Sequence, residues 1–222
     1  MIMKRKYRTV IFDLDGTLLD TLDDLTASVN AALTKYGLPL RSKDEVRRFV
    51  GNGVLRLMER AVPGGHAHPE FDRIYQEFRK DYGLHCNDRT RPYPGVLELL
   101  ARLKSKGYGL AIVSNKADFA VNTLREIYFD GLIDVAIGER ETIRKKPAPD
   151  TVLAALERLG ADVETAVYVG DSEVDLETAA NVPMDVISVS WGFRDAALLK
   201  ERGACRLASN AGELEEMLCG MS

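Results

Sequence analysis

The sequence predicts an α/β fold with a Rossmann-like parallel sheet core, helices on both faces of the sheet, and an inserted all-helical domain. Two observations lead to this prediction. From about residue 91 onward, short runs rich in β-branched residues alternate with amphipathic helical segments, the pattern of a parallel sheet with crossover helices. Between about residues 20 and 88, helical periodicity dominates and no segment has the character of a strand.

The first strand is expected at Thr9–Phe12, a short run of β-branched and aromatic residues. Apolar residues then recur at helical spacing over residues 22–36, 42–50, 54–58 and 71–82. Ser42 and Glu45 form a capping-box pattern at the start of one of these helices. We therefore expect a helical domain over residues 20–89, inserted into a core formed by residues 1–19 and 90–222.

The second part of this core is expected to alternate regularly. Helices are predicted over residues 96–106, 119–127, 151–159 and 173–181, and strands over residues 108–113, 133–137, 166–169 and 185–189. A final short strand and helix are expected within residues 205–222. The first strand rejoins this sheet across the helical insert, and the crossovers should be right-handed.

Composition sets limits on function. The net charge of −4 gives no electrostatic reason to expect a nucleic-acid partner. The basic start, Met1–Arg8, is followed by an apolar run too short for a signal peptide core or a membrane span, so we expect a solvated leader and no membrane partner. Cys86, Cys205 and Cys219 are widely spaced, and we expect reduced thiols in a cytoplasmic protein. The sequence leaves the oligomeric state open.

Polar residues follow the predicted strands at their carboxyl ends, the edge where open parallel sheets bind ligands. Asp13 and Asp15 come after the first strand and start from one face of it, because side-chain direction repeats every two residues. Like-charged carboxylates about 4 Å apart repel by roughly 4 kcal/mol at an effective dielectric constant of about 20. A metal cation, or a proton on one of the acids, would relieve this repulsion. Gly16 allows a sharp turn beside them, and Thr17 adds a hydroxyl group.

Three further segments are expected at the same edge of the sheet. They are Ser114-Asn115 after the second strand, Lys145-Lys146 before Pro147, and Gly170-Asp171-Ser172 with Asp175 one helical turn beyond. Each segment has a structural alternative, namely a helix cap, a solvated lysine pair and a strand-to-helix turn, respectively. Their coincidence with the two aspartates favours a site for a dianion and a divalent cation.

The segments Asp13-x-Asp15-x-Thr17, Ser114, Lys146 before Pro147, and Gly170-Asp171-Ser172-x-x-Asp175 resemble, in order, the four motifs of the haloacid dehalogenase superfamily. The resemblance spans nearly the whole chain, including a helical cap inserted after the first motif. Residues 48–54 and 91–96 are similar to those of the phosphoglycolate phosphatase family within that superfamily.

The resemblance implies Mg²⁺-dependent hydrolysis of a small phosphorylated metabolite, similar to phosphoglycolate. Asp13 would attack phosphorus to give an aspartyl-phosphate, and Asp15 would be the general acid and base. The phosphate-binding residues would be Thr17, Ser114, Asn115 and Lys146. The metal ligands would be Asp13, the Asp15 backbone carbonyl and Asp171, with Asp175 orienting Lys146 or the metal site.

Several alternatives stay open. Lys145 is the alternative to Lys146 as the site lysine. A transferase similar to β-phosphoglucomutase, or a pyrophosphatase, would share the four motifs. A catalytically silent phosphate-binding protein is the non-enzyme alternative, although such a protein would be expected to have lost Asp13 or Asp15. Asp15 favours phosphoryl over carbon–halogen chemistry, which has no need of a second acid.

Substrate selectivity is expected in the helical insert. The turn at Gly51, Asn52 and Gly53 is expected to enter the site, with Arg47 or Arg48 available to a substrate carboxylate. A solvated arginine on an exposed helix face is the alternative. Residues 191–194, after the last clear strand, are expected at the rim of the site or in apolar packing.

Overall fold

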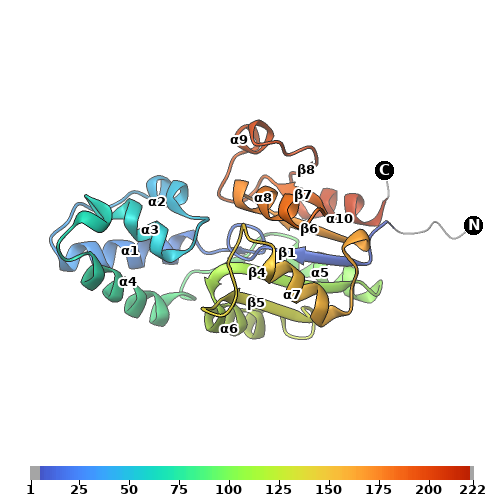
Figure 1. The fold of residues 1–222 in the computed structure, drawn as a ribbon, viewed down its shortest axis with the longest axis horizontal. Helices are drawn as coiled ribbons and strands as arrows, with labels where there is room; N and C mark the ends of the chain where they lie inside the picture. The colour runs from blue at the N-terminus through green and yellow to red at the C-terminus, as the bar shows by residue number, and fades with distance from the viewer. Residues whose placement is uncertain (1–5, 221–222) are drawn as a thin grey trace, which may run out of the picture. The chain divides into compact units, whose positions relative to one another are not determined.

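The computed structural model describes residues 6–220, and the chain divides into two compact units (Figure 1). One unit comprises Met1–Leu18 and Pro92–Ser222, and the other comprises Leu19–Arg91. The division into a helical domain over residues 20–89 and a core of residues 1–19 and 90–222 stays a prediction. Within residues 6–220, no helix combines the length and apolarity that a membrane span requires. Most of the predicted basic leader lies outside the described residues, and Lys6 and Arg8 at its end are exposed.

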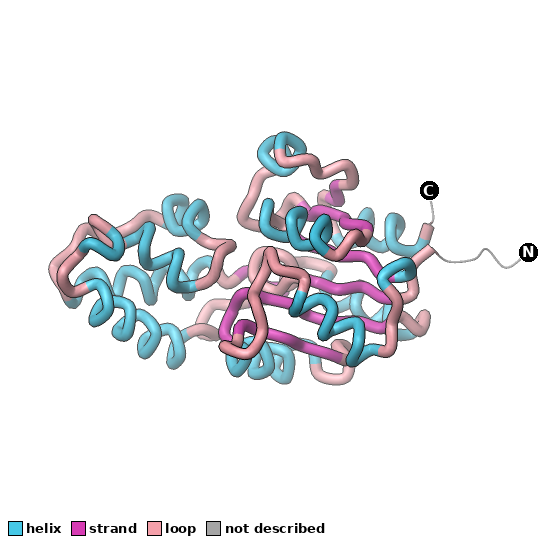
Figure 2. The backbone as a smooth tube through the Cα atoms, in the orientation of Figure 1, coloured by secondary structure: helices cyan, strands magenta, loops and turns pink. Residues whose placement is uncertain are grey.

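The first unit is built on a six-stranded sheet, whose strands are magenta in Figure 2. All neighbouring strands of this sheet are parallel. In sheet order its strands are β5 (Val135–Glu139), β4 (Gly109–Ala117), β1 (Thr9–Phe12), β6 (Ala166–Gly170), β7 (Asp185–Val189) and β8 (Leu207–Ala208). The first strand in sequence thus lies in the middle of the sheet, between two strands that follow it by about 100 and 155 residues. The Rossmann-like α/β fold is confirmed.

Helices cover both faces of this sheet (Figure 1). They are α5 (Val96–Ser105), α6 (Asp118–Phe129), α7 (Asp150–Leu159), α8 (Glu173–Asn181), α9 (Ala196–Glu201) and α10 (Ala211–Cys219), with a short 3₁₀ turn η2 (Val163–Thr165). On one face, α7 and α8 pack on Ile11, Val113 and Tyr168 in a common core. On the other, α5 packs against β4 and α10. Each fully buried aliphatic or aromatic side chain contributes about 1.5–3 kcal/mol, so the two cores fix which side of each strand faces which helix.

Strand register brings the ends of three strands to one level. Phe12 of β1 lies beside Ile112 of β4 and Val169 of β6. The Asp13 amide continues the ladder by donating to the Val169 carbonyl oxygen at 2.9 Å. Residues that directly follow these positions therefore emerge together at the carboxyl edge of the sheet.

The second unit is helical. Its helices are α1 (Leu22–Lys35), α2 (Lys43–Phe49), α3 (Val54–Ala61) and α4 (Phe71–His85), with a 3₁₀ turn η1 (Gly65–Ala67). α1 packs against α4 and α2, and α2 packs against α3. The predicted capping box is present at the start of α2, where Ser42 and Glu45 bond reciprocally. The buried Asp24 carboxylate accepts hydrogen bonds from the backbone amides of Arg89 and Thr90, which ties α1 to the end of the unit.

The structure differs from the sequence expectations in three short elements and in the length of one strand. β2 (Leu19–Asp20) and β3 (Arg91–Pro92) form a two-stranded sheet that is too short to leave a periodic signal. α9 was not expected either, since six residues give less than two turns of periodicity, although Asp195 caps it by accepting from the Leu198 amide. β4 runs to Ala117 through a register shift after Val113, four residues past its predicted end.

Candidate active site

The loop after β1 presents the two aspartates at the carboxyl edge of the sheet. Asp13 is buried, and its Oδ1 accepts a hydrogen bond from the Leu14 amide at 2.7 Å. The Asp15 side chain is 16% exposed. Gly16 has a φ of +87°, and a Cβ atom there would lie 2.4 Å from the Asp171 carboxylate. Only glycine therefore allows this turn to pack against the end of β6.

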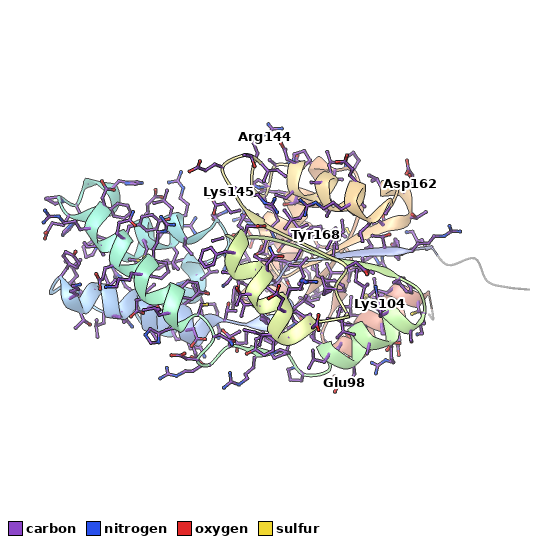
Figure 3. The ribbon with its side chains drawn as sticks, turned by 90° about the horizontal axis from the view of Figure 1, so that it is seen from below. Glu98, Lys104, Arg144, Lys145, Asp162 and Tyr168 are labelled. Carbon is purple, nitrogen blue, oxygen red and sulfur yellow. The ribbon has the colours of Figure 1, made fainter. Side chains whose placement is uncertain are left out.

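Lys146 contacts carboxylates from two segments, the loop after β1 and the start of α8. Its Nζ lies 2.9 Å from Asp13 Oδ1 and 2.8 Å from Asp175 Oδ1. It also donates to the Tyr168 hydroxyl at 3.0 Å, and its side chain is only 2% exposed. Lys145, by contrast, pairs with Glu139 at 2.9 Å and its side chain is 36% exposed. The structure therefore brings Lys146, and not Lys145, to Asp13. Figure 3 labels Lys145, on the loop, and Tyr168, in the strand layer.

Asp171 and Asp175 follow β6. The Asp171 carboxylate accepts from the Thr17 hydroxyl at 3.2 Å and from the Phe193 amide at 2.7 Å. Asp175 is an N-terminal residue of α8, and its Oδ2 accepts from the amide and the hydroxyl of Ser172. This capping box fixes Asp175 so that its Oδ1 faces Lys146.

Burial dominates the electrostatics of the Asp13 and Asp171 carboxylates. It raises the pKa of Asp13 to about 7, against the opposing effect of Lys146 and with a further rise from Asp175. Burial, together with Asp175 and Asp13, also raises the pKa of Asp171 well above its usual value. Burial alone would lower the pKa of Lys146, but the Asp13 and Asp175 carboxylates outweigh it, and the pKa lies well above its usual value. Lys146 is therefore a cation at neutral pH, and one cation does not offset all the acids around it.

The donor set fits a divalent cation. Asp13, Asp171 and Asp175 offer oxygen atoms that lie within 4.8 Å of one another, and all three residues are buried. Carboxylate oxygens are the ligands that Mg²⁺ takes in proteins. The Asp175 carboxylate accepts from Lys146 and Ser172, and the Asp171 carboxylate accepts from Thr17 and Phe193. The raised pKa values mark the uncompensated negative charge that such an ion would neutralise.

Ser114 and Asn115 lie within β4, and α6 does not begin until Asp118, so the helix-cap alternative is wrong. Ser114 is buried at the carboxyl edge of the sheet, and its hydroxyl accepts from the Lys116 amide. The Asn115 amide nitrogen donates to the Lys146 carbonyl oxygen at 3.0 Å. Asn115 thus holds the loop that carries Lys146, and its contact with phosphate stays a prediction.

Sequence reasoning missed two residues at this site. Lys116 Nζ lies 3.0 and 3.3 Å from the two carboxylate oxygens of Asp15. The Tyr168 hydroxyl contacts Lys146 and lies 3.2 Å from Asp175 Oδ1. Both carry a sequence signal, because Lys116 is two residues beyond Ser114 on the same strand and Tyr168 is the one polar-tipped residue in an otherwise apolar strand.

The expected rim segment does lie beside the first motif. The Trp191 indole nitrogen donates to the Thr17 carbonyl oxygen at 3.0 Å, and the Phe193 amide contacts Asp171. The Trp191 ring also lies 6.5 Å, centroid to centroid, from that of Tyr93. Residues 191–193 therefore support the loops that carry Thr17 and Asp171.

The predicted selectivity residues belong to the second unit. Arg47 and Arg48 are exposed in the last turn of α2. Gly51, Asn52 and Gly53 form the turn between α2 and α3, in which Gly53 precedes the first residue of α3. Arg60 donates to the Asn52 side-chain oxygen at 3.0 Å and to the Phe49 carbonyl oxygen at 2.7 Å, so this turn is braced from α3. The recognition role of these residues stays a prediction.

Comparison with known proteins gives a consistent result. The model of the family described as haloacid dehalogenase-like hydrolase matches residues 10–189. The chain is 33% identical to the phosphoglycolate phosphatase of Nitrosococcus oceani over 97% of this chain and 98% of that protein. It is 32% identical to the N-acetylmuramic acid 6-phosphate phosphatase of Pseudomonas aeruginosa over 86% of this chain and 85% of that protein.

A solved structure extends this similarity to the fold. It is that of a protein of Lactobacillus delbrueckii subsp. bulgaricus provisionally named phosphoglycolate phosphatase, with a TM-score of 0.93 and 38% sequence identity. The match covers 97% of this chain and 99% of that one.

Proposed function

The chain belongs to the haloacid dehalogenase-like hydrolase family and is a phosphatase, and we propose that it hydrolyses a small phosphate monoester through an aspartyl-phosphate on Asp13, with Mg²⁺ as cofactor. The observation that carries this proposal is the contact of the buried Asp13 with Lys146, itself fixed by Asp175. This contact supports the proposal because it puts the Asp13 carboxylate, which we assign as the nucleophile, beside a lysine cation at the carboxyl edge of the sheet.

In the first step, an Asp13 oxygen attacks phosphorus and the bond to the leaving alcohol breaks. Among the described residues, the Leu14 amide and Lys146 both contact Oδ1 of Asp13, which leaves Oδ2 as the attacking atom. Asp15 gives a proton to the departing alkoxide, so a neutral alcohol leaves. In the second step, water attacks the phosphorus of the aspartyl-phosphate, Asp15 takes up the proton, and phosphate leaves with Asp13 restored.

Binding of the phosphoryl group falls to the remaining residues of the site. Thr17 and Ser114 offer hydroxyl groups, Asn115 an amide group and Lys146 a positive charge. Asp13, the Asp15 carbonyl and Asp171 would hold Mg²⁺, which when bound would supply positive charge that offsets the negative charge of the phosphoryl group. Phosphoryl transfer depends chiefly on positioning and on charge neutralisation, and a rigid buried cluster provides both.

We take phosphoglycolate as the first substrate to test, because relatives of that name cover nearly the whole chain. The phosphatase of Pseudomonas aeruginosa named for N-acetylmuramic acid 6-phosphate is similar over most of the chain, so this sugar phosphate belongs in the same panel. A β-phosphoglucomutase-like transferase or a pyrophosphatase would use the same core residues. The names of these relatives favour hydrolysis of a monoester.

The test is release of inorganic phosphate from phosphoglycolate, N-acetylmuramic acid 6-phosphate, pyrophosphate and p-nitrophenyl phosphate, with Mg²⁺ and with EDTA. We expect release that requires Mg²⁺, with the highest kcat/KM on phosphoglycolate. Absence of release from all four in Mg²⁺ would contradict the proposal. Transfer to a second sugar phosphate without phosphate release would identify the transferase instead.

A further inference from the structure

Lys116 is a second lysine buried at the site, and it contacts the second aspartate. Its Nζ lies 3.0 Å from Oδ1 and 3.3 Å from Oδ2 of Asp15, and its side chain is 3% exposed. Lys146 makes the corresponding contact with Asp13 from a different element. We propose that Lys116 is a positioning residue that fixes the orientation of the Asp15 carboxyl group for its proton transfers. This inference rests on the proposed function, in which Asp15 is the general acid and base.

The geometry restricts rotation of the Asp15 side chain. An ammonium group within hydrogen-bond distance of both carboxylate oxygens opposes rotation about the bond that carries the carboxyl group. Asp15 needs such a restraint more than Asp13 does, because its side chain is the more exposed of the two and the residue directly precedes Gly16. A general acid acts only if it is held within reach of the leaving-group oxygen.

The strand holds Lys116 firmly. β4 continues through Ala117, and although its pairing with β5 shifts register between Val113 and Ala117, Lys116 belongs to the strand and not to a loop. A Cβ atom on the neighbouring Gly138 would lie 2.6 Å from the Lys116 carbonyl oxygen and 2.4 Å from the Asp118 Cα. The Gly138 amide donates to the Asp118 side chain at 2.8 Å. This close approach fixes the end of β4, and with it the origin of the Lys116 side chain.

Burial of Lys116 argues against a purely structural role. Taking an ammonium group out of water is costly, and a well-packed apolar residue is often as stabilising at such a position as a buried ion pair. The residues of β4 that precede Ser114, from Leu110 to Val113, are apolar and buried in the core. Within β4, the buried cation lies where the strand reaches the two aspartates, and the same strand supplies Ser114.

The test is a double-mutant cycle on two substrates that differ in their need for an acid. An alkyl monoester, such as phosphoglycolate or glycerol phosphate, must expel an alkoxide, whereas p-nitrophenyl phosphate expels a stable phenolate. The four proteins are the parent, Lys116→Met, Asp15→Asn and the double variant. Lys116→Arg, which keeps the charge, is the rescue variant, and Lys145→Met is the matched control at an exposed lysine. Melting temperatures verify folding, and Lys116→Gln replaces Lys116→Met if the latter does not fold.

We expect Lys116→Met to lower kcat on the alkyl monoester by roughly tenfold or more, a part of the contribution that general acid–base catalysis makes. The loss on p-nitrophenyl phosphate should be several-fold smaller, and Lys116→Arg should recover part of the alkyl activity. In the Asp15→Asn background, removing Lys116 should cause almost no further loss on p-nitrophenyl phosphate.

Equal losses on both substrates, or losses that multiply in the double variant, would overturn the inference, since Lys116 would then act apart from Asp15. Parental activity in Lys116→Met would overturn it as well. Each of these outcomes leaves the proposed function standing, provided that Asp15→Asn loses alkyl activity. Parental alkyl activity in Asp15→Asn would instead overturn the acid–base assignment on which both proposals rest.

Discussion

At the residue scale, the site pairs carboxylates with two buried lysines. Asp13 contacts Lys146, which also contacts Asp175, and Asp15 contacts Lys116. Removing one member of a buried ion pair leaves an uncompensated charge and is strongly destabilising. Each pair is therefore expected to matter for both catalysis and stability, and the two effects must be measured separately.

The choice between the adjacent lysines is decided by exchanging each for alanine. Lys146→Ala should lower kcat by roughly 10²–10³-fold, the range observed when a preorganised electrostatic stabiliser is removed. Lys145→Ala, the matched control, should stay within about twofold because this lysine contacts the half-exposed Glu139. Melting curves separate loss of fold from loss of catalysis. Near-normal turnover in Lys146→Ala would reject the assignment.

The raised pKa of Asp13 predicts a pH-dependent effect of Mg²⁺ on stability. The folded metal-free protein holds this proton with a pKa of about 7, whereas the unfolded chain releases it near its usual value of about 3.9. The folded state thus binds more protons between these values, and its free energy of unfolding falls as pH rises through them, by on the order of 4 kcal/mol at most. If Mg²⁺ binds the ionised Asp13 carboxylate, as we propose, its stabilisation of the folded protein should be larger at about pH 8 than at about pH 5.

Thermal unfolding with Mg²⁺ and with EDTA at the two pH values measures this difference. An Asp13→Asn variant, which lacks this titrating group, is the control and should show a smaller pH dependence than the parent protein. An equal increase in melting temperature at both pH values in the parent protein would contradict the assignment of Asp13 to the metal site.

At the element scale, the end of each strand decides which side chains reach the site. The alternation of strands and helices was sufficient to predict the parallel sheet, and the confirmed sheet brings Asp13, Ser114 and Asp171 to one edge. The sequence could not reveal that β4 continues past Val113, because polar residues at a strand end resemble a helix cap. For the same reason Lys116 was missed. α9 was missed because its six residues are too few to show periodicity.

The α2 helix carries a prediction about substrate choice. If Arg48 binds the carboxylate of phosphoglycolate, Arg48→Met should lower kcat/KM on phosphoglycolate by about tenfold or more, since hydrogen bonds to charged groups contribute about 1.5–3 kcal/mol. Activity on p-nitrophenyl phosphate, which has no carboxylate, should change little. Arg47→Met tests the adjacent arginine, and Arg73→Met, an exposed arginine of α4, is the control. Equal losses on both substrates, or none for either arginine, would reject a recognition role.

At the scale of the whole molecule, the site is assembled from segments far apart in the chain. Residues from the loop after β1, the end of β4, the loop before α7 and the start of α8 converge although they span residues 13–175. The order and register of the strands bring these segments together. The spacing of the motifs in the sequence does not by itself specify that order or register. Strand β1 lies between β4 and β6, so its two aspartates meet side chains from both neighbours. In our proposal these core residues act on the phosphoryl group, and none of them is assigned to recognition of the leaving group.

The most direct test of the account is to trap the phosphorylated enzyme. The protein is mixed with a phosphate monoester and Mg²⁺, quenched in acid, reduced with borohydride and digested, and the peptide that contains residues 9–17 is analysed by mass spectrometry. We predict reduction of the Asp13 side chain to an alcohol, which depends on substrate and is absent in Asp13→Asn. A protein that turns over its substrate without any label on Asp13, or with the label on another residue, would contradict the account.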